Sequence, residues 1–356
     1  MTMATKKVVY LFGAGATHAV VNAFNPDLGL LTNNIQEEIE ANYSSRGMDN
    51  TIWNELVTQG NDVEHLISVL ESQHNYSASE KLKKYYRDAI VNLSEKIPGN
   101  PFPTNLYSVL IDFHNIKDIN EELLSFISLN YEDILERTIK AHFNCDVDYV
   151  IKPDKKKSRK SSYKVYKLHG SFNWFNSRPI SVRKMTAIKS KNTLWIPPGV
   201  EKRKENYPFN LLWGKVIEDL LNCDILRVVG CSLSRNDWGL IPILYTVQRF
   251  NQNKKGIDIE IIDFPDTAKK ISSTYKYLNV KSLTDLPDFI AFYKKQFSNA
   301  SSQSEITSEI ETKFSDTSKI NPFQEWLDAK ADFLQSQEID IRTERNYLYN
   351  FYYKES

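Results

Sequence analysis

The chain has 356 residues, of which 41% are hydrophobic and 25% are charged, as in a globular protein that can bury a sizeable core. Basic and acidic residues both number 45, so the net charge gives no general argument for binding to nucleic acid or to a membrane. Three cysteines are too few for a disulfide framework or for a zinc site made of two Cys-x-x-Cys pairs, and we expect no zinc.

Five short apolar runs have the composition of β-strands, and each is followed by small or polar residues: 8–12, 124–129, 163–168, 224–229 and 257–262. Most of them lead into a segment with helical spacing, and this alternation is typical of a parallel sheet covered by helices. We therefore predict an α/β fold with a Rossmann-like parallel sheet. Ligands of such sheets bind beyond the carboxyl ends of the strands.

Residues 33–115, between the first two predicted strands, have helical periodicity, and we predict an inserted helical subdomain there. Four apolar residues of this stretch fall on one helical face: Val63, Leu66, Ile67 and Leu70. The main domain is expected to span residues 1–296. Because no apolar run reaches membrane-spanning length and no signal segment is recognisable, we expect a cytoplasmic protein that does not contact a membrane.

The end of the chain differs in composition from the rest. Residues 297–319 are rich in Ser, Thr and Glu and are predicted to form a linker. Residues 320–356 are predicted to form a C-terminal helical segment, whose start is marked by Asn321 and Pro322. The apolar face of this segment packs either on its own domain or against another subunit.

A glycine turn, Gly13-Ala-Gly-Ala-Thr17, follows the first predicted strand directly. Such a turn lets backbone N–H groups approach a phosphate at a helix N-terminus, and Thr17 could add a hydroxyl donor. The sixth position of the dinucleotide-binding fingerprint is His18 instead of Gly or Ala, so the turn differs from the usual dehydrogenase motif. A tight strand-to-helix turn without a ligand is the alternative.

Polar side chains also stand where later strands end. Asn130 is either a helix N-cap or an amide that holds a carboxamide, a ribose hydroxyl or a water. His169 is either satisfied within the protein or an accessible base, because an imidazole can take a proton from a hydroxyl or a water near neutral pH. Asp263 suits a carboxylate that accepts hydrogen bonds from an adenosine ribose, which favours NAD over NADP.

A basic run lies between Lys152 and Lys191, with thirteen Lys or Arg residues and one acidic residue, Asp154. One interpretation is a solvated loop, and the other is a contact with nucleic acid or another anionic partner. No motif of interleaved aromatic residues accompanies the run.

Four segments in order, GAGAT at 13–17, LNYED at 129–133, KLHGS at 167–171 and VVGCSLS at 228–234, resemble the sirtuin-like superfamily. The similarity is greatest to its bacterial branch of NAD-consuming antiphage-defence proteins, and it spans residues 8–295. It implies a sheet of the sirtuin, DHS-like NAD-binding type with NAD as substrate. The zinc module of protein-deacylating sirtuins has no counterpart, because the cysteine pairs are missing.

The resemblance also implies roles for individual residues. Asn130 and His169 correspond to the family's catalytic Asn and His. The NAD-binding positions that carry over belong to the glycine turn and to a later Gly-x-Ser turn: Gly13, Ala14, Gly15, Ala16, Thr17, Gly230 and Ser232. Glu132 stands where the family usually has Asp, and Asp133 beside it could compensate for the longer side chain.

We therefore expect an NAD glycohydrolase that cleaves NAD to nicotinamide and ADP-ribose and depletes NAD in antiphage defence. The alternatives are a non-catalytic subunit that binds NAD or ADP-ribose, and an NAD-dependent protein deacylase, which the missing cysteine pairs disfavour. Control by homo-oligomer assembly or by a separate protein is expected. Among relatives of this length, a ring-forming DNA-translocase ATPase of the HerA type is one such partner.

Overall fold

A computed structural model of the protein describes residues 5–24, 28–43, 54, 63–97, 105–114, 121–151, 162–198, 206–234, 237, 239–251, 256–263 and 265–285. Three predicted features lie outside these residues: the linker 297–319, the C-terminal segment 320–356 and the part of the basic run at 152–161. Within the described residues, no helix combines the length and the apolar character needed to cross a membrane.

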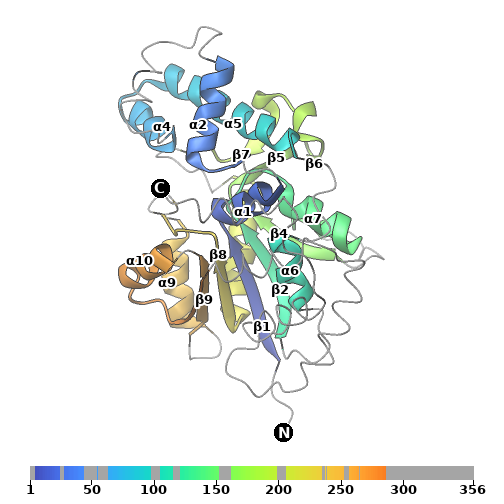
Figure 1. Ribbon diagram of the computed structural model, residues 1–356, viewed down its shortest axis with the longest axis vertical. Coiled ribbons are helices and arrows are strands. Elements are labelled where there is room, and N and C mark those ends of the chain that lie inside the picture. The colour runs from blue at the N-terminus through green and yellow to red at the C-terminus, as the bar shows by residue number, and fades with distance from the viewer. Residues whose placement is uncertain are drawn as a thin grey trace, which may run out of the picture.

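The fold is built on a seven-stranded sheet in which all paired neighbours run parallel, in the order β10-β9-β8-β1-β2-β4-β3 (Figure 1). Its strands are β1 (Lys6–Phe12), β2 (Glu121–Ser128), β3 (Asp146–Asp148), β4 (Ser162–Lys167), β8 (Ile225–Val229), β9 (Asp258–Asp263) and β10 (Val280–Asp285). The predicted α/β class with a Rossmann-like parallel sheet is confirmed, and all five predicted strands are present. The two strands that were not predicted, β3 and β10, form the two edges of the sheet.

Helices cover both faces of this sheet. Along β1, Val8, Tyr10 and Phe12 point into one core and Val9 and Leu11 into the other, as the alternation of side chains on a strand requires. The first core includes residues of α1 (Ala14–Phe24), α6 (Leu106–Phe113) and α7 (Ile134–Phe143), and the second includes residues of α8 (Phe209–Asn222), α9 (Ile241–Phe250) and α10 (Pro265–Thr274). Because both faces of β1 are buried from Val8 onward, its sequence from Val8 to Phe12 is one continuous apolar run.

Three further helices, α2 (Thr32–Tyr43), α4 (Val63–Ser72) and α5 (Tyr76–Glu95), pack together beyond the carboxyl ends of the strands, at the top of Figure 1. We call them the helical layer. The predicted apolar face of α4 is confirmed, since all four of its residues are buried: Val63, Leu66, Ile67 and Leu70. Apart from Thr32, the first residue of α2, the helical layer falls within the predicted insertion 33–115. The status of this insertion as a separate subdomain stays a prediction.

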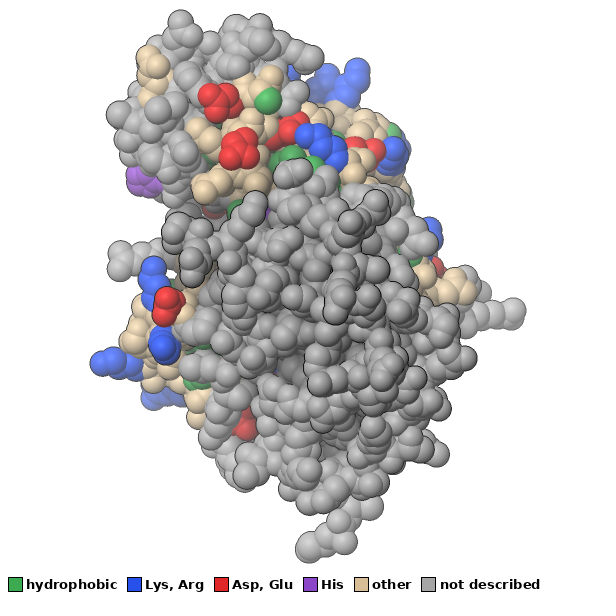
Figure 2. All heavy atoms as spheres, in the orientation of Figure 1, with side chains coloured by type: hydrophobic (Ala, Val, Ile, Leu, Met, Phe, Trp, Pro, Cys, Tyr) green, Lys and Arg blue, Asp and Glu red, His purple; other side chains and the backbone are tan. Residues whose placement is uncertain are grey.

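A second sheet, which was not predicted, follows His169 directly. It is antiparallel, with the order β6-β5-β7, and consists of β5 (Gly170–Phe175), β6 (Ser181–Val182) and β7 (Thr193–Trp195). Two short 3-10 helices, η2 (Met185–Ala187) and η3 (Ser190–Asn192), connect β6 to β7 along the chain. Arg87 of α5 ties it to the helical layer, because its guanidinium donates to Thr193 Oγ1 (2.9 Å) and to the Ile188 carbonyl (2.6 Å). Figure 2 shows lysine and arginine side chains over this sheet, where exposed members of the basic run lie: Arg178, Arg183, Lys184, Lys189 and Lys191.

Candidate active site

A cleft of about 450 Å³ lies beyond the carboxyl ends of β1, β2, β4, β8 and β9. Most of the predicted site residues line it: Gly13, Ala14, Gly15, Thr17, Asn130, Glu132, His169, Gly230, Ser232 and Asp263. The rest of the lining includes residues that lead into or belong to the helical layer: Leu30, Leu31, Ile35, Glu64, Tyr86 and Ile90. Loops that are far apart in the sequence thus meet at one cavity, whose volume is typical of a small-molecule site.

The glycine turn after β1 packs directly against the turn after β8. A Cβ atom on Gly13 would lie 2.6 Å from the Gly230 carbonyl oxygen, and one on Gly230, where φ is +53°, would lie 2.1 Å from the Ala16 nitrogen. Close packing of two turns therefore accounts for these glycines. The N–H groups of Gly15 and Ala16 donate to the carbonyls of Gly230 (2.9 Å) and Gly13 (3.1 Å), so the group placed to meet an anion is the N–H of exposed Ala14, the first residue of α1. Ala16 itself is buried and does not line the cleft.

Asn130 presents one atom to the cleft. Its Nδ2 donates to the Gly13 carbonyl (2.9 Å) and to Thr17 Oγ1 (2.8 Å). Because a carbonyl oxygen can only accept, this arrangement fixes the orientation of the amide and uses both of its hydrogens. The interpretation of Asn130 as an N-cap is wrong, since α7 begins at Ile134 and Asp133 occupies the N-cap position. What Asn130 can offer a ligand is the acceptor Oδ1.

Thr17 and Glu132 hold this arrangement in place. Thr17 Oγ1 donates to Glu132 Oε1 (2.6 Å) and lies 2.5 Å from the hydroxyl of Tyr107. A threonine has one hydroxyl hydrogen, so Tyr107 is the donor in the second contact, and burial together with the charge of Glu132 raises its pKa and keeps it protonated. Glu132 Oε2 accepts from the N–H of Ile134 (2.6 Å), which caps the first turn of α7. The hydroxyl hydrogen of Thr17 is therefore spent within the protein.

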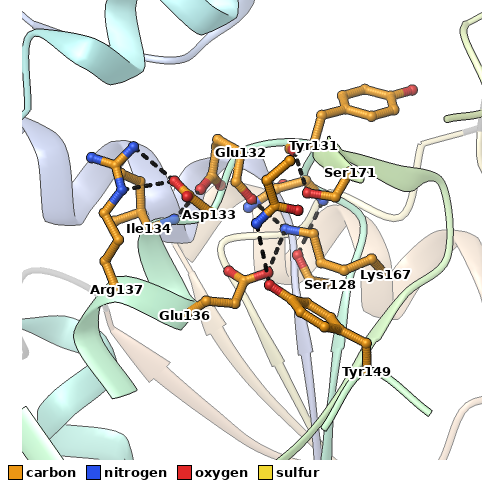
Figure 3. A network of polar contacts seen from close by, with 12 residues as sticks. Ser128, Tyr131, Glu132, Asp133, Ile134, Glu136, Arg137, Tyr149, Lys167 and Ser171 are labelled. Atoms are coloured by element: carbon orange, nitrogen blue, oxygen red, sulfur yellow. Dashed lines mark hydrogen bonds and ion pairs between the residues drawn. The ribbon is translucent and has the colours of Figure 1, made fainter. Parts of the chain in front are cut away.

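The loop that carries Asn130 and Glu132 is anchored by a buried lysine. Lys167, on β4, donates to the Glu132 carbonyl, and its Nζ lies 3.3 Å from Glu136 Oε1 (Figure 3). Burial raises the pKa of Glu136 to about 7, although the charge of Lys167 acts in the opposite direction. The carboxylate of Asp133 pairs with Arg137 at 2.7 Å, and Asp133 does not line the cleft. The structure therefore does not bring Asp133 to the position expected for it.

His169 is held by its first ring nitrogen and presents its second. Nδ1 lies 3.3 Å from the Leu129 carbonyl oxygen, and Nε2 lies 3.9 Å from Oδ1 of Asp237. The ring packs beside Tyr131, with 6.0 Å between the ring centroids. The adjacent Gly170 is required by the second sheet, because a Cβ atom there would lie 2.5 Å from the Leu194 carbonyl oxygen. An imidazole in this place can act as a proton acceptor.

Sequence reasoning missed several polar residues of the cleft, among them Glu64, Tyr86 and Asp237. Glu64 and Tyr86 come from α4 and α5, and Glu64 Oε1 accepts from the Tyr86 hydroxyl (2.9 Å). No local pattern marks these two positions, because only the packing of the helical layer brings them to the sheet. Asp237 follows Ser232 in the same loop, and a carboxylate just after a strand end is a signal that could have identified it.

Metal-binding side chains do not gather in the described residues, where no group of three or more His, Cys, Asp or Glu is placed to hold a metal ion. The three cysteines are free thiols. Cys231 lines the cleft but is buried, and burial raises the pKa of its thiol, so near pH 7 it is not a nucleophilic thiolate.

No protein-family model matches the sequence, and no curated protein matches it either. Solved structures that resemble the chain include one described for the mechanism and regulation of Sir2 enzymes (13% identity, covering 93% of this chain and 94% of that chain, TM-score 0.39). Others are Sir2Tm bound to a propionylated peptide (14%, 81% and 91%, 0.39) and a Sir2 homologue mutant in complex with ADP-ribose (15%, 94% and 93%, 0.36). Identities and TM-scores are low, so the similarity assigns no activity to this chain.

Proposed function

We propose that this chain is an NAD glycohydrolase that cleaves NAD to nicotinamide and ADP-ribose. The observation that carries the proposal is the meeting of Asn130, His169 and the N-terminus of α1 at one cleft beyond the strand ends. The sequence resemblance to NAD-consuming sirtuin-like proteins selects NAD as the ligand of this cleft. The missing Cys-x-x-Cys pairs favour hydrolysis over deacylation.

The binding mode follows from the charges around the cleft. The pyrophosphate is expected at the N-terminus of α1, where the Ala14 N–H and the helix dipole favour an anion. Asp263 ends β9 and lines the cleft, and we expect it to accept hydrogen bonds from the adenosine ribose and to repel a 2′-phosphate. The ribose that bears nicotinamide then lies toward Asn130 and His169.

In the proposed reaction the bond between the ribose C1′ and the nicotinamide nitrogen breaks. The electron pair leaves with nicotinamide, which becomes neutral, and positive charge develops on the ribose. Asn130 Oδ1 accepts a hydrogen bond from the attacking water or from a ribose hydroxyl, and His169 accepts the proton. Because the leaving group is neutral, an orienting amide and one base are sufficient.

Release of nicotinamide from NAD by the purified protein tests the proposal. We expect release by the wild type and a loss of roughly 10²-fold or more in His169→Ala, the contribution of a proton-transfer residue. His65→Ala is the matched control, because His65 is exposed on α4 and does not line the cleft. Equal release by the wild type and His169→Ala would contradict the proposal.

Two other outcomes would point to the alternative functions. Nicotinamide release that requires an acylated peptide would indicate a deacylase. Thermal stabilisation by NAD or ADP-ribose without turnover would indicate a binding subunit.

We further propose that the activity is gated, since uncontrolled loss of NAD would harm the host cell during antiphage defence. Control would come from homo-oligomer assembly or from a partner such as a HerA-type ring-forming DNA-translocase ATPase, and this part rests on the sequence resemblance. The exposed lysines and arginines of the second sheet keep an anionic partner as a candidate. Co-purification from the native host with mass measurement tests both ideas, and a monomer without a partner would contradict them.

A further inference from the structure

A carboxylate that the proposed reaction does not use faces His169. Asp237 lies in the loop after β8, and its Oδ1 is 3.9 Å from His169 Nε2. The side chains of His169 and Asp237 are 7% and 16% exposed, so water screens the pair only weakly. The loop is held locally, because Ser234 Oγ donates to Asp237 Oδ2 (3.4 Å) and the Asp237 N–H donates to the Ser234 carbonyl (3.0 Å).

The tautomer of His169 determines whether its Nε2 can hydrogen-bond to Asp237 Oδ1. Nδ1 lies 3.3 Å from the Leu129 carbonyl oxygen, which can only accept, so Nδ1 carries the hydrogen. Nε2 then holds the lone pair and faces Asp237 Oδ1, and two acceptors with no hydrogen between them stay apart. After Nε2 gains a proton, the same arrangement places a cationic N–H in front of a carboxylate.

We propose that Asp237 is the positioning residue that stabilises the His169 imidazolium formed during NAD cleavage, an inference that rests on the proposed function. The water oxygen bonds to C1′ as the bond from C1′ to the nicotinamide nitrogen breaks, and the water proton moves to Nε2. His169 later gives this proton to solvent, so NAD and water yield ADP-ribose, nicotinamide and one proton. Asp237 attracts only the protonated imidazole and therefore favours the transition state over bound substrate.

Other titratable groups line the same cleft: Glu64 on α4, Tyr86 on α5, Tyr131 and Glu132 after β2, Cys231 after β8, and Asp263 at the end of β9. Glu64 accepts from Tyr86, and both carboxylate oxygens of Glu132 are bonded within the protein. Burial raises the pKa of Tyr131 and of Cys231, so both stay neutral near pH 7. Among the described carboxylates that line the cleft, Asp237 is the one that lies against Nε2 of His169.

A titration of His169 in the full-length protein tests the pairing without any need for activity. Histidine labelled with ¹³C gives one imidazole signal per residue, and the signal that is missing from His169→Gln belongs to His169. In Asp237→Asn, which keeps the size and removes the charge, His169 is expected to protonate at lower pH than in the wild type. Asp148→Asn removes an exposed carboxylate outside the cleft and should leave the curve unchanged. Identical curves for all three proteins would overturn the inference.

Kinetics then test the role in the reaction. Asp237→Asn is expected to lower kcat for NAD cleavage by about tenfold or more at pH 7, to change KM by less than about twofold, and to move the acid limb of the pH–rate profile to lower pH. Asp237→Glu should recover part of the loss. A wild-type kcat and pH profile in Asp237→Asn, with His169→Ala inactive, would refute the inference and leave the proposed function intact. If the wild type itself does not cleave NAD, the proposed function fails, and the titration alone decides whether the two residues are paired.

Discussion

Two clusters of buried polar side chains lie on the same sheet and are built on opposite plans. In the Arg227 cluster, fully buried Arg227 on β8 donates to Glu260 (2.6 Å), to both carboxylate oxygens of Glu121 (2.8 and 3.0 Å) and to the hydroxyl of Tyr10 (3.1 Å). Burial and the charge of Arg227 lower the pKa of nearby His114, which therefore adds no second positive charge near pH 7. Both carboxylates of this cluster therefore have a charged partner inside the protein.

In the cleft, Asn130 instead keeps part of its bonding capacity, because it gives both amide hydrogens to the protein and presents Oδ1. His169 bonds through Nδ1 to the Leu129 carbonyl, and its Nε2 lies 3.9 Å from Oδ1 of Asp237 at the same cleft. The difference separates two uses of buried polarity. Arg227 and its carboxylates bond to one another, whereas a group that can act on a ligand keeps one atom at a cavity.

The largest effect, a loss of folding stability, is expected when Arg227 is removed from its cluster. Arg227→Met removes the charged partner of Glu121 and Glu260, whose side chains are only 5% and 15% exposed, and this costs about 3–5 kcal/mol. This is a large share of the roughly 5–15 kcal/mol that stabilises an ordinary domain. Urea unfolding measures the change.

Lys215→Met is the control for Arg227→Met, because Lys215 pairs with Glu218 on the exposed surface of α8. It should change the unfolding midpoint little, because water and salt screen an exposed ion pair. Equal unfolding midpoints for Arg227→Met and the wild type would mean that the Arg227 cluster does not stabilise the fold.

The second effect is on the rate of NAD cleavage and comes from a substitution in the cleft. Asn130→Asp keeps the shape of the side chain but sets a carboxylate oxygen against the Gly13 carbonyl, which repels it. The displaced side chain can no longer orient the ribose or the water. We expect nicotinamide release to slow by about 10²-fold, or about 2.7 kcal/mol in the barrier.

Asn251→Asp is a chemically matched control for Asn130→Asp. The Nδ2 of buried Asn251 also donates to a backbone carbonyl, that of Cys223 (2.8 Å), but Asn251 does not line the cleft. The substitution should lower the free energy of unfolding and leave the rate per folded molecule unchanged. A similar loss of rate in both variants would show that the Asn130 effect is one of stability alone.

The sequence predicts the parts of the fold whose signal is local. β1 is buried from Val8 to Phe12 and β8 along its whole length, and both are apolar there except for Arg227. Each predicted strand ends at a turn that lines the cleft. β3, β6 and β7 have only two or three residues each, too short for a pattern to be recognised. β5 and β10 have six residues each, but polar residues interrupt their apolar positions. The edges of the fold therefore come from tertiary pairing.

For the candidate site, the sequence indicates which residues come together better than it indicates what each one does. The hydrogen bond between Thr17 and Glu132 joins residues 115 positions apart, and it alone shows that the Thr17 hydroxyl is not free for a ligand. Asp133 looks equivalent to Glu132 in the sequence, yet Arg137, one turn further along α7, draws it into an ion pair. Which partner each of these side chains takes depends on tertiary contacts that a local sequence pattern does not reveal.

The smallest effect, a change in how stability depends on pH, is expected at Glu136, which is buried beside Lys167. Burial raises the pKa of Glu136 to about 7, against an ordinary value of 4.5, so between these values the folded protein keeps a proton that the unfolded chain has lost. The stability that this proton contributes is present below pH 4.5 and is lost as pH rises through 7. The amide of Glu136→Gln does not titrate, so the variant does not lose stability in this way as pH rises. The difference in free energy of unfolding, variant minus wild type, should therefore rise by about 2 kcal/mol from pH 5 to pH 7. Exposed Glu122→Gln should show no such trend. A stability difference between Glu136→Gln and the wild type that does not change with pH would mean that Glu136 is already ionised at pH 5, as a carboxylate paired with Lys167.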